Sequence, residues 1–413
     1  MGDVVAQRHY DVVIIGGGLV GASLACALSP LGIKVALVEA VAFKATSQPS
    51  YDDRTLALSA SSCKILQGLG IWPQVEHNAT AIREIQVREL KRPGRVIMDP
   101  AELGLDRFGH VLEAREFGAA MAAALPMLDN VDFLSPVSVA ALETGDNDCL
   151  LEIRSEEGVQ HISARLVVGA DGADSFVRES LGIESERHDY GQSAVICNVT
   201  PEEDHRGRAF ELFTPSGPMA VMPHINGRCG LIWCVPNEDA NALLELPQVE
   251  FMRRANVRFG KRLGRFLKMG KRSSYPLRLV RACEDIRPRV VLMGNAAHAI
   301  HPVGAQGFNL GLRDAATLAE VLADAVRRDP ATDPGDMDLL RRYSAWRKPD
   351  QDGTIAYSDG LARIYSNTSA LVSAGRVAGL LAHALVPPLR RQMATKAMGF
   401  RGKIPRLARG EAL

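Results

Sequence analysis

The chain has 413 residues, with 48 basic and 48 acidic side chains and a hydrophobic fraction of 46%. This length predicts two or three domains. A chain of this size buries most of the surface that its unfolded form exposes, so it needs no disulfide bonds or structural metal ions to be stable. The balanced charge argues against a nucleic-acid binder, and the composition excludes intrinsic disorder and collagen-like repeats. The seven cysteines are scattered and never spaced Cys-x-x-Cys. We therefore expect free thiols in a reducing compartment, and neither a disulfide framework nor a zinc site.

The first forty residues predict one βαβ unit. Residues 10–15 form an apolar, β-branched run, as expected of a strand buried on both faces. Residues 22–31 are small and apolar and suit a helix packed closely on a sheet, and residues 34–39 form a second strand that ends in a carboxylate. Residues 12–33 carry no charge and match a membrane span in length, but their glycines and the Ser29-Pro30 break favour a strand, a turn and a helix.

The turn of this unit carries the pattern Gly-x-Gly-x-x-Gly. Gly16 permits a tight turn, Gly18 lets backbone N–H groups approach a pyrophosphate, and Gly21 lets helix and strand pack closely. Glu39 ends the second strand, where a carboxylate binds ribose hydroxyls and repels a 2′-phosphate. The complete βαβ unit, with its glycine turn and Glu39, predicts a dinucleotide site. The alternative is a tight turn without a ligand.

Two later segments repeat an apolar strand followed by a glycine-containing turn, at residues 165–172 and 289–295. Because ligands bind at the carboxyl ends of parallel strands, we expect all three turns to face one cofactor. From about residue 191 to 275, short apolar runs alternate with turn signals, which predicts an antiparallel sheet. We expect a cofactor domain over residues 1–185 with a short excursion near 80–100, and a β substrate domain over 186–275. The cofactor domain resumes over 276–335, and a helical region covers 336–413.

Residues 168–178 (Val-Gly-Ala-Asp-Gly-Ala-Asp-Ser-Phe-Val-Arg) and 294–311 carry two further motifs. With the first turn, they resemble in order the three signatures of the class A FAD monooxygenases, the para-hydroxybenzoate hydroxylase superfamily. The resemblance spans residues 10–320. It implies an α/β fold in which a Rossmann-like FAD-binding domain is interrupted by an antiparallel β-sheet substrate domain and followed by C-terminal helices.

The resemblance also implies cofactor contacts. The helix that opens near Gly307 and includes Asn309 would direct N–H groups at the electron-rich edge of the flavin. Asp171 belongs to the second signature, and Asn295 stands where the family has Asp. The remaining predicted contacts are Arg54 and Arg115, each of which has a surface ion pair as its alternative.

The third signature departs from the family at a second position. Ala305 replaces the first glycine of the usual Gly-Gln-Gly, with Gly304 one residue earlier. If position 305 needs a positive φ, alanine is strained there; otherwise the turn is shifted by one residue.

Within the superfamily, residues 209–214, 227–229, 294–314 and 347–367 resemble the ubiquinone-biosynthesis hydroxylases. This branch implies hydroxylation of a polyprenylated phenol, 2-polyprenyl-6-methoxyphenol, through a flavin C4a-hydroperoxide. FAD would be the cofactor, NADH or NADPH the electron donor and O₂ the co-substrate. The alternatives are an FAD-dependent prenyl or quinone reductase or dehydrogenase of the same fold, and a non-catalytic subunit of a quinone-biosynthesis assembly.

Substrate contacts follow from the same resemblance. Phe213, Pro223 and Pro302 are expected in the wall around the ring. His301 is a candidate proton relay to the phenol, with a structural role as the alternative. His298 and His301 stand three residues apart, but no third ligand is placed by spacing, so we expect no metal.

The chain after residue 359 carries nine basic side chains and one acid, Glu411, between apolar runs. Such segments suit an anionic membrane surface or a partner complex, and the alternative is a helix pair that caps the core. We expect a cytoplasmic protein, peripheral at the inner face of the membrane.

Overall fold

The computed structural model describes residues 8–42, 54–367 and 369–413. Its first sheet contains five parallel strands and an antiparallel extension. The order is β18 (Ile286–Arg287), β19 (Val290–Leu292), β11 (Gly158–Gly169), β1 (Arg8–Ile15), β2 (Val35–Val38) and β8 (Val131–Leu134), with β10 (Cys149–Ser155) and β9 (Ser138–Thr144) continuing from β11.

The strands of this sheet are apolar on both faces, so both faces are buried. Helices cover one of them. Ile14 and Leu37 pack with Leu24 and Leu312 in one core cluster. Leu24 lies on α1 (Leu19–Leu28) and Leu312 on α8 (Gln306–Arg328), and the two helices contact each other. The same layer contains α2 (Ala60–Gly68), α3 (Trp72–Val75), α4 (Ala114–Ala124) and α12 (Arg406–Arg409). Residues 12–33 are thus a strand, a turn and a helix, as predicted.

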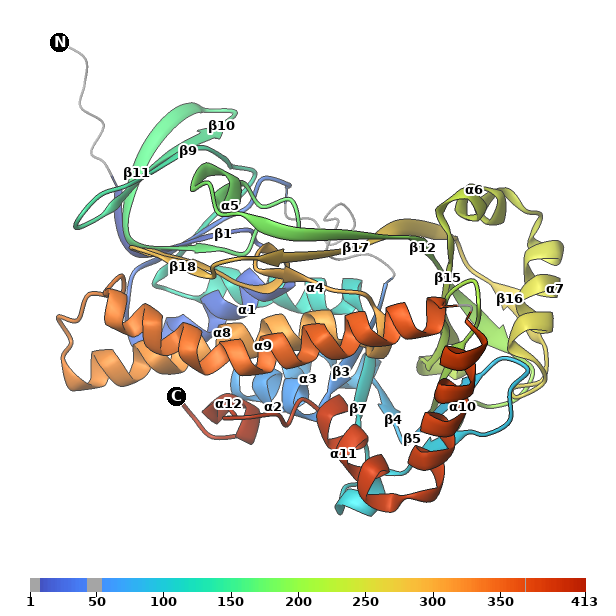
Figure 1. The fold of residues 1–413 in the computed structure, drawn as a ribbon. Helices are drawn as coiled ribbons and strands as arrows, with labels where there is room; N and C mark the ends of the chain where they lie inside the picture. The colour runs from blue at the N-terminus through green and yellow to red at the C-terminus, as the bar shows by residue number, and fades with distance from the viewer. Residues whose placement is uncertain (1–7, 43–53, 368) are drawn as a thin grey trace, which may run out of the picture.

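The second sheet lies beside the first (Figure 1) and is joined to it by two long strands, β12 (Ser185–Pro201) and β17 (Ser273–Ala282). Its other strands are β20 (His298–Ala299), β15 (Cys229–Pro236), β14 (Met219–Pro223), β13 (Arg208–Phe213), β5 (Glu84–Glu89), β6 (Val96–Met98) and β16 (Phe266–Met269). A small third sheet contains β3 (Thr55–Ser59), β7 (Gly109–Glu113) and β4 (Thr80–Ile82).

The second sheet differs from the predicted pattern in two respects. It is not wholly antiparallel, because β5 pairs with β13 in parallel. Two helices, α6 (Asn237–Glu245) and α7 (Gln248–Phe259), also lie where strands and turns were expected, and they cover one face through Leu243 and Phe251. The signals that were overlooked are a proline just before each helix, Pro236 and Pro247, and acids in each first turn.

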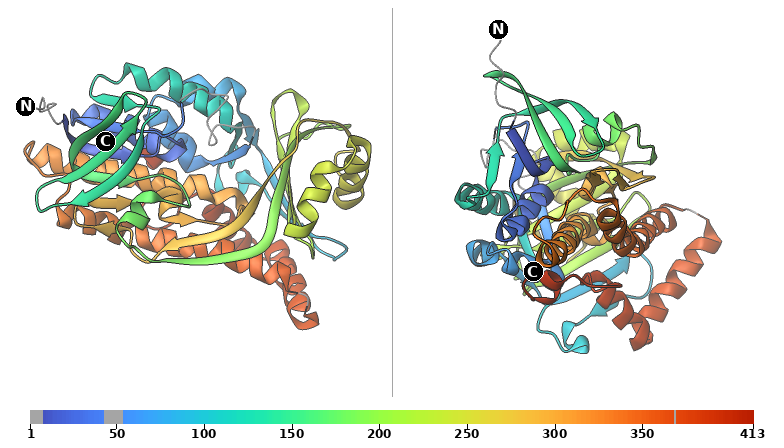
Figure 2. Two further views of the ribbon diagram at one scale, coloured as in Figure 1. Left: turned by 90° about the horizontal axis from the view of Figure 1, so that it is seen from above. Right: turned by 90° about the vertical axis from the view of Figure 1, so that its left-hand side faces the viewer.

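The C-terminal helices extend along both sheets (Figures 1 and 2). α9 (Met337–Ser366) packs along α8, and α10 (Ala370–Leu385) and α11 (Pro387–Ala397) contact β6. Short 3₁₀ helices are η1 (Ser29–Leu31), η2 (Glu76–Asn78), η3 (Pro100–Leu103), η4 (Leu125–Met127), η5 (Ile225–Gly227), η6 (Gly294–Ala296) and η7 (Val303–Ala305). Over the described residues, a single helix of sufficient length and apolarity to cross a membrane is absent; α10 and α11 meet that requirement only jointly, with a 95° bend between them.

Candidate active site

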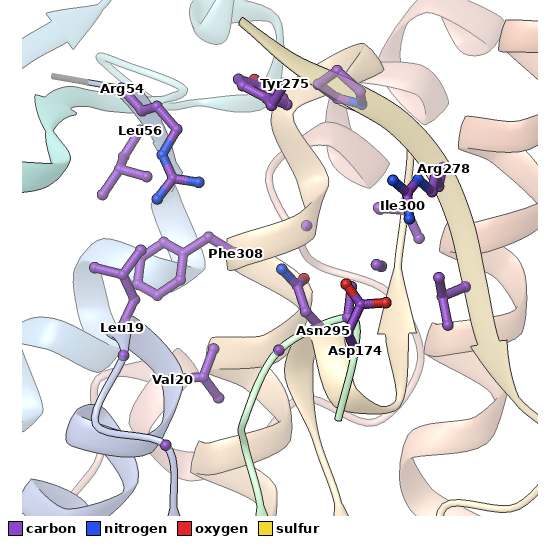
Figure 3. Close-up of a pocket in the computed structure, with 18 of the residues that line it drawn as sticks. Leu19, Val20, Arg54, Leu56, Asp174, Tyr275, Arg278, Asn295, Ile300 and Phe308 are labelled. Atoms are coloured by element: carbon purple, nitrogen blue, oxygen red, sulfur yellow. The ribbon is translucent and has the colours of Figure 1, made fainter. Parts of the chain in front are cut away.

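A cavity of about 800 Å³ lies where the three strand-end turns meet. Gly16 and Gly18 follow β1, Asp171 follows β11, and Asn295 follows β19. The second sheet closes the opposite side through residues of β14, β15 and β17. Figure 3 shows Asn295 and Asp174 on one side of this space and Leu19 and Phe308 on the other. One elongated space therefore touches all three turns.

The first turn can only be made of glycine at two positions. Gly16 has φ +105°, and a Cβ there would lie 2.5 Å from the carbonyl oxygen of Ala170. A Cβ on Gly21 would overlap the carbonyl oxygen of Gly16. Both residues keep backbone close to backbone, so the N–H groups at the start of α1 remain uncovered on the cavity side.

Glu39 is fixed beside this turn, directly after β2. Its Oε2 accepts a 2.7 Å hydrogen bond from the Gly17 N–H, and its Oε1 accepts a 2.8 Å bond from the Val41 N–H. The carboxylate lines the cavity. It is thus held at the place where a ribose hydroxyl of a nucleotide on the turn would reach it.

Asp171 lines the same cavity, but its carboxylate serves its own loop. It accepts hydrogen bonds from the Ser175 hydroxyl (2.6 Å) and the Val177 N–H (3.1 Å) at the start of α5 (Phe176–Ser180). Burial raises the pKa of Asp171 above its ordinary value. Its visible role is to shape the second turn.

The turn before α8 is strained at an alanine. Ala305 has φ +52° and ψ +41°, the left-handed conformation, and Gly304 before it has φ +71°. Position 305 thus has a positive φ and the alanine is strained, which is the first of the two alternatives predicted for this turn. Gly307 and Phe308, in the first turn of α8, line the cavity, and the first N–H groups of a helix lack intrahelical partners.

Ala305→Gly is expected to stabilise the protein modestly. Relief of the left-handed alanine contributes about 1–2 kcal/mol, and the added freedom of glycine in the unfolded chain removes about 0.4–1 kcal/mol. We expect a net gain of about 0.5–1 kcal/mol in unfolding free energy, measured by urea denaturation. Gly304→Ala, which adds a second left-handed alanine, should shift stability in the opposite direction.

Asn309 is a brace between elements. Its Oδ1 accepts hydrogen bonds from the Ser59 N–H (2.9 Å) and the Ser62 hydroxyl (2.7 Å). Its Nδ2 donates to the carbonyl oxygens of Ala57 and Ala305, both at 2.8 Å. The side chain is buried and fully used, and it holds the start of α8 against α2 and β3. A flavin contact by Asn309 through its backbone N–H stays a prediction.

The two predicted arginines are placed differently. Arg54 lines the cavity, and in Figure 3 its guanidinium extends toward Phe308. Arg115, at the start of α4, forms ion pairs with Glu113 and, at 3.3 Å, with Glu116. Arg115 is absent from the residues that line this cavity. The structure thus favours the ion-pair alternative for Arg115.

A second cavity, of about 590 Å³, adjoins the first. Most of its wall is apolar and comes from β5, β6, β13 and the C-terminal helices, with Ile85, Val96, Phe213, Leu361 and Leu380 among its residues. The two cavities share wall residues: Ala57, Glu211, Met222, Val303 and Ala305. We call this shared region the junction; it lies directly before the first turn of α8.

The four predicted substrate residues do not lie together. Pro302 lines the first cavity, and Phe213 lines the second, where it stacks on Tyr365 with ring centroids 3.5 Å apart. Pro223 is buried at the end of β14 and lines neither cavity. His301 is also buried outside both: its Nδ1 accepts a hydrogen bond from the Val303 N–H (3.2 Å), and burial lowers its pKa to about 4. The structure therefore corrects the expectation of a His301 relay and of Pro223 in the wall.

A buried cluster of charges supports the third turn from behind. Asp314 on α8 accepts hydrogen bonds from the Gly294 N–H (3.2 Å), His298 Nε2 (2.6 Å) and Arg347 Nε (2.7 Å). Burial alone would raise the pKa of Asp314, but His298 and Arg347 hold it below its usual range. The cluster is completed by Arg313 and Asp350, which pair at 2.7 Å. The charge of Asp314 is thus committed to holding Gly294.

Metal chemistry has no site in the described part of the chain. No group of three or more His, Cys, Asp or Glu side chains gathers there in a way that holds an ion. His298, one of the two histidines considered as metal ligands, forms a hydrogen bond with Asp314.

The comparisons with known proteins agree with this geometry. A family model described as "FAD binding domain" matches residues 9–356. The chain is 38% identical over 411 residues to ubiquinone hydroxylase UbiL of Rhodospirillum rubrum, covering 99% of this chain and 94% of that one. It is 32% identical to 3-demethoxyubiquinol 3-hydroxylase of Escherichia coli K12, covering 96% and 100%.

The chain belongs to the FAD-binding-domain family of flavin monooxygenases. The solved structure of p-nitrophenol 4-monooxygenase PnpA from Pseudomonas putida superposes with a TM-score of 0.78 at 22% identity, covering 96% of this chain and 99% of that one. PqsL from Pseudomonas aeruginosa superposes with a TM-score of 0.74, also at 22% identity, covering 91% and 100%. These confirm the predicted fold class, and the chain is an FAD-dependent monooxygenase.

FAD fits the residues of the first cavity. The glycine turn leaves N–H groups uncovered where a pyrophosphate would lie, and a Cβ at Gly16 would break the turn by meeting the Ala170 carbonyl. Glu39 lines the same cavity, where it would reach a ribose hydroxyl, and Gly307 and Phe308 of the first turn of α8 line it too. The glycine turn and Glu39 were predicted from their spacing, and the start of α8 from the family resemblance; their contacts with FAD stay predictions.

The second cavity and Glu211 are not among the features predicted from the sequence. A signal for Glu211 is present: it is an acid in the middle of the apolar run Ala-Phe-Glu-Leu-Phe. Alternation along a strand places Ala209, Glu211 and Phe213 on one face. An acid between two apolar neighbours on one face marks either a paired charge or a functional group.

Proposed function

We propose that this monooxygenase hydroxylates the aromatic ring of a polyprenylated phenol in ubiquinone biosynthesis, with 2-polyprenyl-6-methoxyphenol as the substrate. The observation that carries the proposal is the second cavity: an apolar space of about 590 Å³ that joins the flavin cavity at the junction. A phenolic ring at the junction would extend its prenyl chain between Ile85, Phe213 and Leu380, and the burial of each CH₂ contributes about 0.8 kcal/mol.

The residues of the first cavity have distinct tasks in this proposal. Gly16 and Gly18 admit the pyrophosphate of FAD, Glu39 binds the ribose and Arg54 contacts the phosphate or ribityl chain. The start of α8 stabilises negative charge on the reduced flavin edge. FAD, reduced by NADH or NADPH, supplies the activation of O₂. The protein's further task is to exclude water around the ring, which the apolar junction residues Met222 and Val303 perform.

The names of the relatives support the substrate class. UbiL and the Escherichia coli relative are named as ubiquinone and demethoxyubiquinol hydroxylases. A reductase of the same fold would also bind FAD and a prenylated substrate, so the reaction product separates it from the proposed hydroxylase. A non-catalytic subunit needs neither bound FAD nor an apolar space beside the flavin cavity.

The test measures the rate at which NADH or NADPH reduces the bound flavin without oxygen. The rate is read from the loss of the flavin's visible absorbance. We expect 2-prenyl-6-methoxyphenol to accelerate the loss at least tenfold, and 2-methoxyphenol, which lacks the prenyl chain, to need a much higher concentration for the same effect. Equal rates with and without phenol would instead support the reductase, and protein that takes up no FAD would support the non-catalytic subunit.

We further propose that α10 and α11 contact a membrane at the inner face, which would supply the lipophilic phenol to a cytoplasmic protein. The fold corrects the charge argument, because five of the nine basic residues after 359 are paired with acids within the chain. The apolar argument stands: Leu371 is 83% exposed and Leu385 77% exposed, and both lie on α10. α10 and α11 also form one wall of the second cavity.

The double variant Leu371→Glu/Leu385→Glu is expected to lose binding to vesicles that contain anionic lipid. Two exposed leucines contribute about 1.5–3 kcal/mol each when buried, so we expect at least a tenfold loss in a flotation assay. The matched control is Val249→Glu/Val257→Glu on α7, whose side chains are 76% and 74% exposed and do not line the second cavity. Equal losses in both variants, or in neither, would contradict contact through α10.

A further inference from the structure

Glu211 lies on the cavity face of β13, at the junction. The strand alternates, so Phe210 and Leu212 pack into the core under α6 and α7 while Glu211 faces the other side with Ala209 and Phe213. Glu211 lines both cavities. It is therefore the carboxylate at the place where the ring of the substrate meets the flavin-side loop.

Glu211 differs from the other carboxylates around the first cavity. Glu39 and Asp171 accept backbone and side-chain hydrogen bonds, and Asp174 pairs with Arg187 at 3.8 Å. Glu211 has neither a hydrogen bond nor an ion pair with any residue that the structure describes. A carboxylate in an apolar wall without a partner contributes nothing to the fold and costs stability.

We propose that Glu211 is a catalytic residue that accepts the phenolic proton of the substrate at the junction. This inference rests on the proposed function, because it needs a phenol in that place. In the step, the phenol O–H bond breaks and an O–H bond forms on Glu211, so the negative charge moves to the ring. One oxygen atom enters the ring, and the other takes up the proton that the ring carbon loses and leaves as water. The proton on Glu211 returns to the ring oxygen. No electrons enter or leave in either proton transfer.

The environment suits Glu211 to this task. Burial raises its pKa from 4.5 to about 7. A phenol has a pKa of about 10, so transfer to Glu211 is unfavourable by roughly 1,000-fold, against roughly 300,000-fold for an ordinary carboxylate. A base with a pKa near the working pH is also ionised when the substrate arrives. The phenolate, which is richer in electrons, is the better nucleophile toward an electrophilic oxygen.

The titratable groups whose pKa values the Glu211 carboxylate affects lie on α9 and β15. Burial, and after it the Glu211 carboxylate, raises the pKa of the Tyr357 hydroxyl on α9 to about 12 and also raises that of the Cys234 thiol on β15. Burial and Glu89 raise the pKa of the Tyr365 hydroxyl on α9 to about 12, with a smaller contribution from Glu211. These three stay neutral at the working pH. The cations that line the cavities do not lower the pKa of Glu211: Arg54, Arg278, Arg376, Lys396 and Arg401. His383 on α10 also lines the second cavity. Glu211 is the carboxylate of that cavity, and its pKa lies near 7.

The first test follows the ionisation of Glu211 without turnover. Because the folded-state pKa is raised, ionisation costs stability as pH rises from 4.5 through 7. Glu211→Gln removes this cost, so the melting temperature of the FAD-loaded variant should exceed that of the wild type by roughly 3 °C more at pH 8 than at pH 5. A difference that does not change with pH would overturn the assignment, whichever substrate the enzyme uses.

The second test measures kcat/KM for hydroxylation of 2-prenyl-6-methoxyphenol. In the wild type it should rise about tenfold between pH 6 and pH 8, with an apparent pKa near 7. In Glu211→Gln it should be at least 100-fold lower and independent of pH, with FAD content unchanged. Glu211→Asp should restore part of the rate and the dependence on pH. If the wild type does not hydroxylate this phenol, the proposed function fails, while the melting-temperature result stands by itself.

A ring-fluorinated analogue of the same phenol separates proton transfer from positioning. Its hydroxyl ionises more readily, so the loss caused by Glu211→Gln should shrink at least tenfold with the analogue. An unchanged loss would show that Glu211 only positions the ring and would overturn the proposal. Tyr357→Phe is the matched control, because it alters the neighbouring hydroxyl and leaves the carboxylate; it should keep the dependence on pH. If kcat/KM lost its dependence on pH in Tyr357→Phe but kept it in Glu211→Gln, the proposal for Glu211 would also be overturned.

Discussion

Replacement of Gly18 by glutamate is expected to abolish FAD binding. Gly18 lines the first cavity and is the N-cap of α1, with φ −69° and ψ −173°, a conformation that any residue adopts. The variant should therefore fold, but its carboxylate would meet the pyrophosphate at the start of the helix. Repulsion of about 4 kcal/mol at close range corresponds to roughly a thousandfold weaker binding. The purified variant should be colourless, as measured by flavin absorbance and by titration with FAD.

The matched control is Gly360→Glu. Gly360 lies within α9, and no heavy atom is within 4 Å of the position its Cβ would take. This control adds the same charge elsewhere and should keep its flavin. A Gly18→Glu protein that is fully yellow would place the pyrophosphate elsewhere, and a colourless Gly360→Glu protein would show that the effect is not local.

Replacement of Arg347 by methionine is expected to cause the largest loss of stability. Arg347 is buried and bonds to Asp314 (2.7 Å) and Asp350 (2.9 Å). Removal of one partner leaves buried carboxylates uncompensated, which costs about 3–5 kcal/mol. Since Asp314 also holds the Gly294 N–H, we expect weaker FAD binding as well. Urea denaturation of the FAD-loaded protein measures the first effect and FAD titration the second.

Arg341→Met on the same helix provides the comparison. Arg341 forms a 2.9 Å ion pair with Asp338 at the surface, where its side chain is 65% exposed. Such pairs contribute about 0–1 kcal/mol. If the two variants unfold at the same urea concentration, the buried cluster does not stabilise the α8–α9 contact.

The flavin side of the site was predictable from the sequence because it depends on backbone. A tight turn after a buried strand needs glycine at fixed spacing, so Gly16, Gly21 and the strand-end Glu39 were readable without a structure. The departure at Ala305 was visible in the sequence, but the sequence left open whether this residue has a positive φ, and the structure decides that it does. The fold class followed from the order of these turns.

The substrate side was not predictable because it depends on which side chains meet across sheets. Glu211 and Met222 come from neighbouring strands and Val303 from the α8 turn, and only the folded arrangement makes them one junction. Asn309 and His301 carry the polar groups that a site needs, but their hydrogen bonds and burial are tertiary facts. The parallel pairing of β5 with β13, which builds the second cavity, joins segments more than a hundred residues apart.

The central claim is oxygen insertion into a prenylated phenol. Its most direct test is mass spectrometry of the product formed by the FAD-loaded enzyme with NADH or NADPH, 2-prenyl-6-methoxyphenol and ¹⁸O₂. Our account predicts a product that carries one labelled oxygen atom on the ring. Unlabelled product that has gained or lost only hydrogen, with the flavin fully bound, would contradict it and assign the protein to the reductases of this fold.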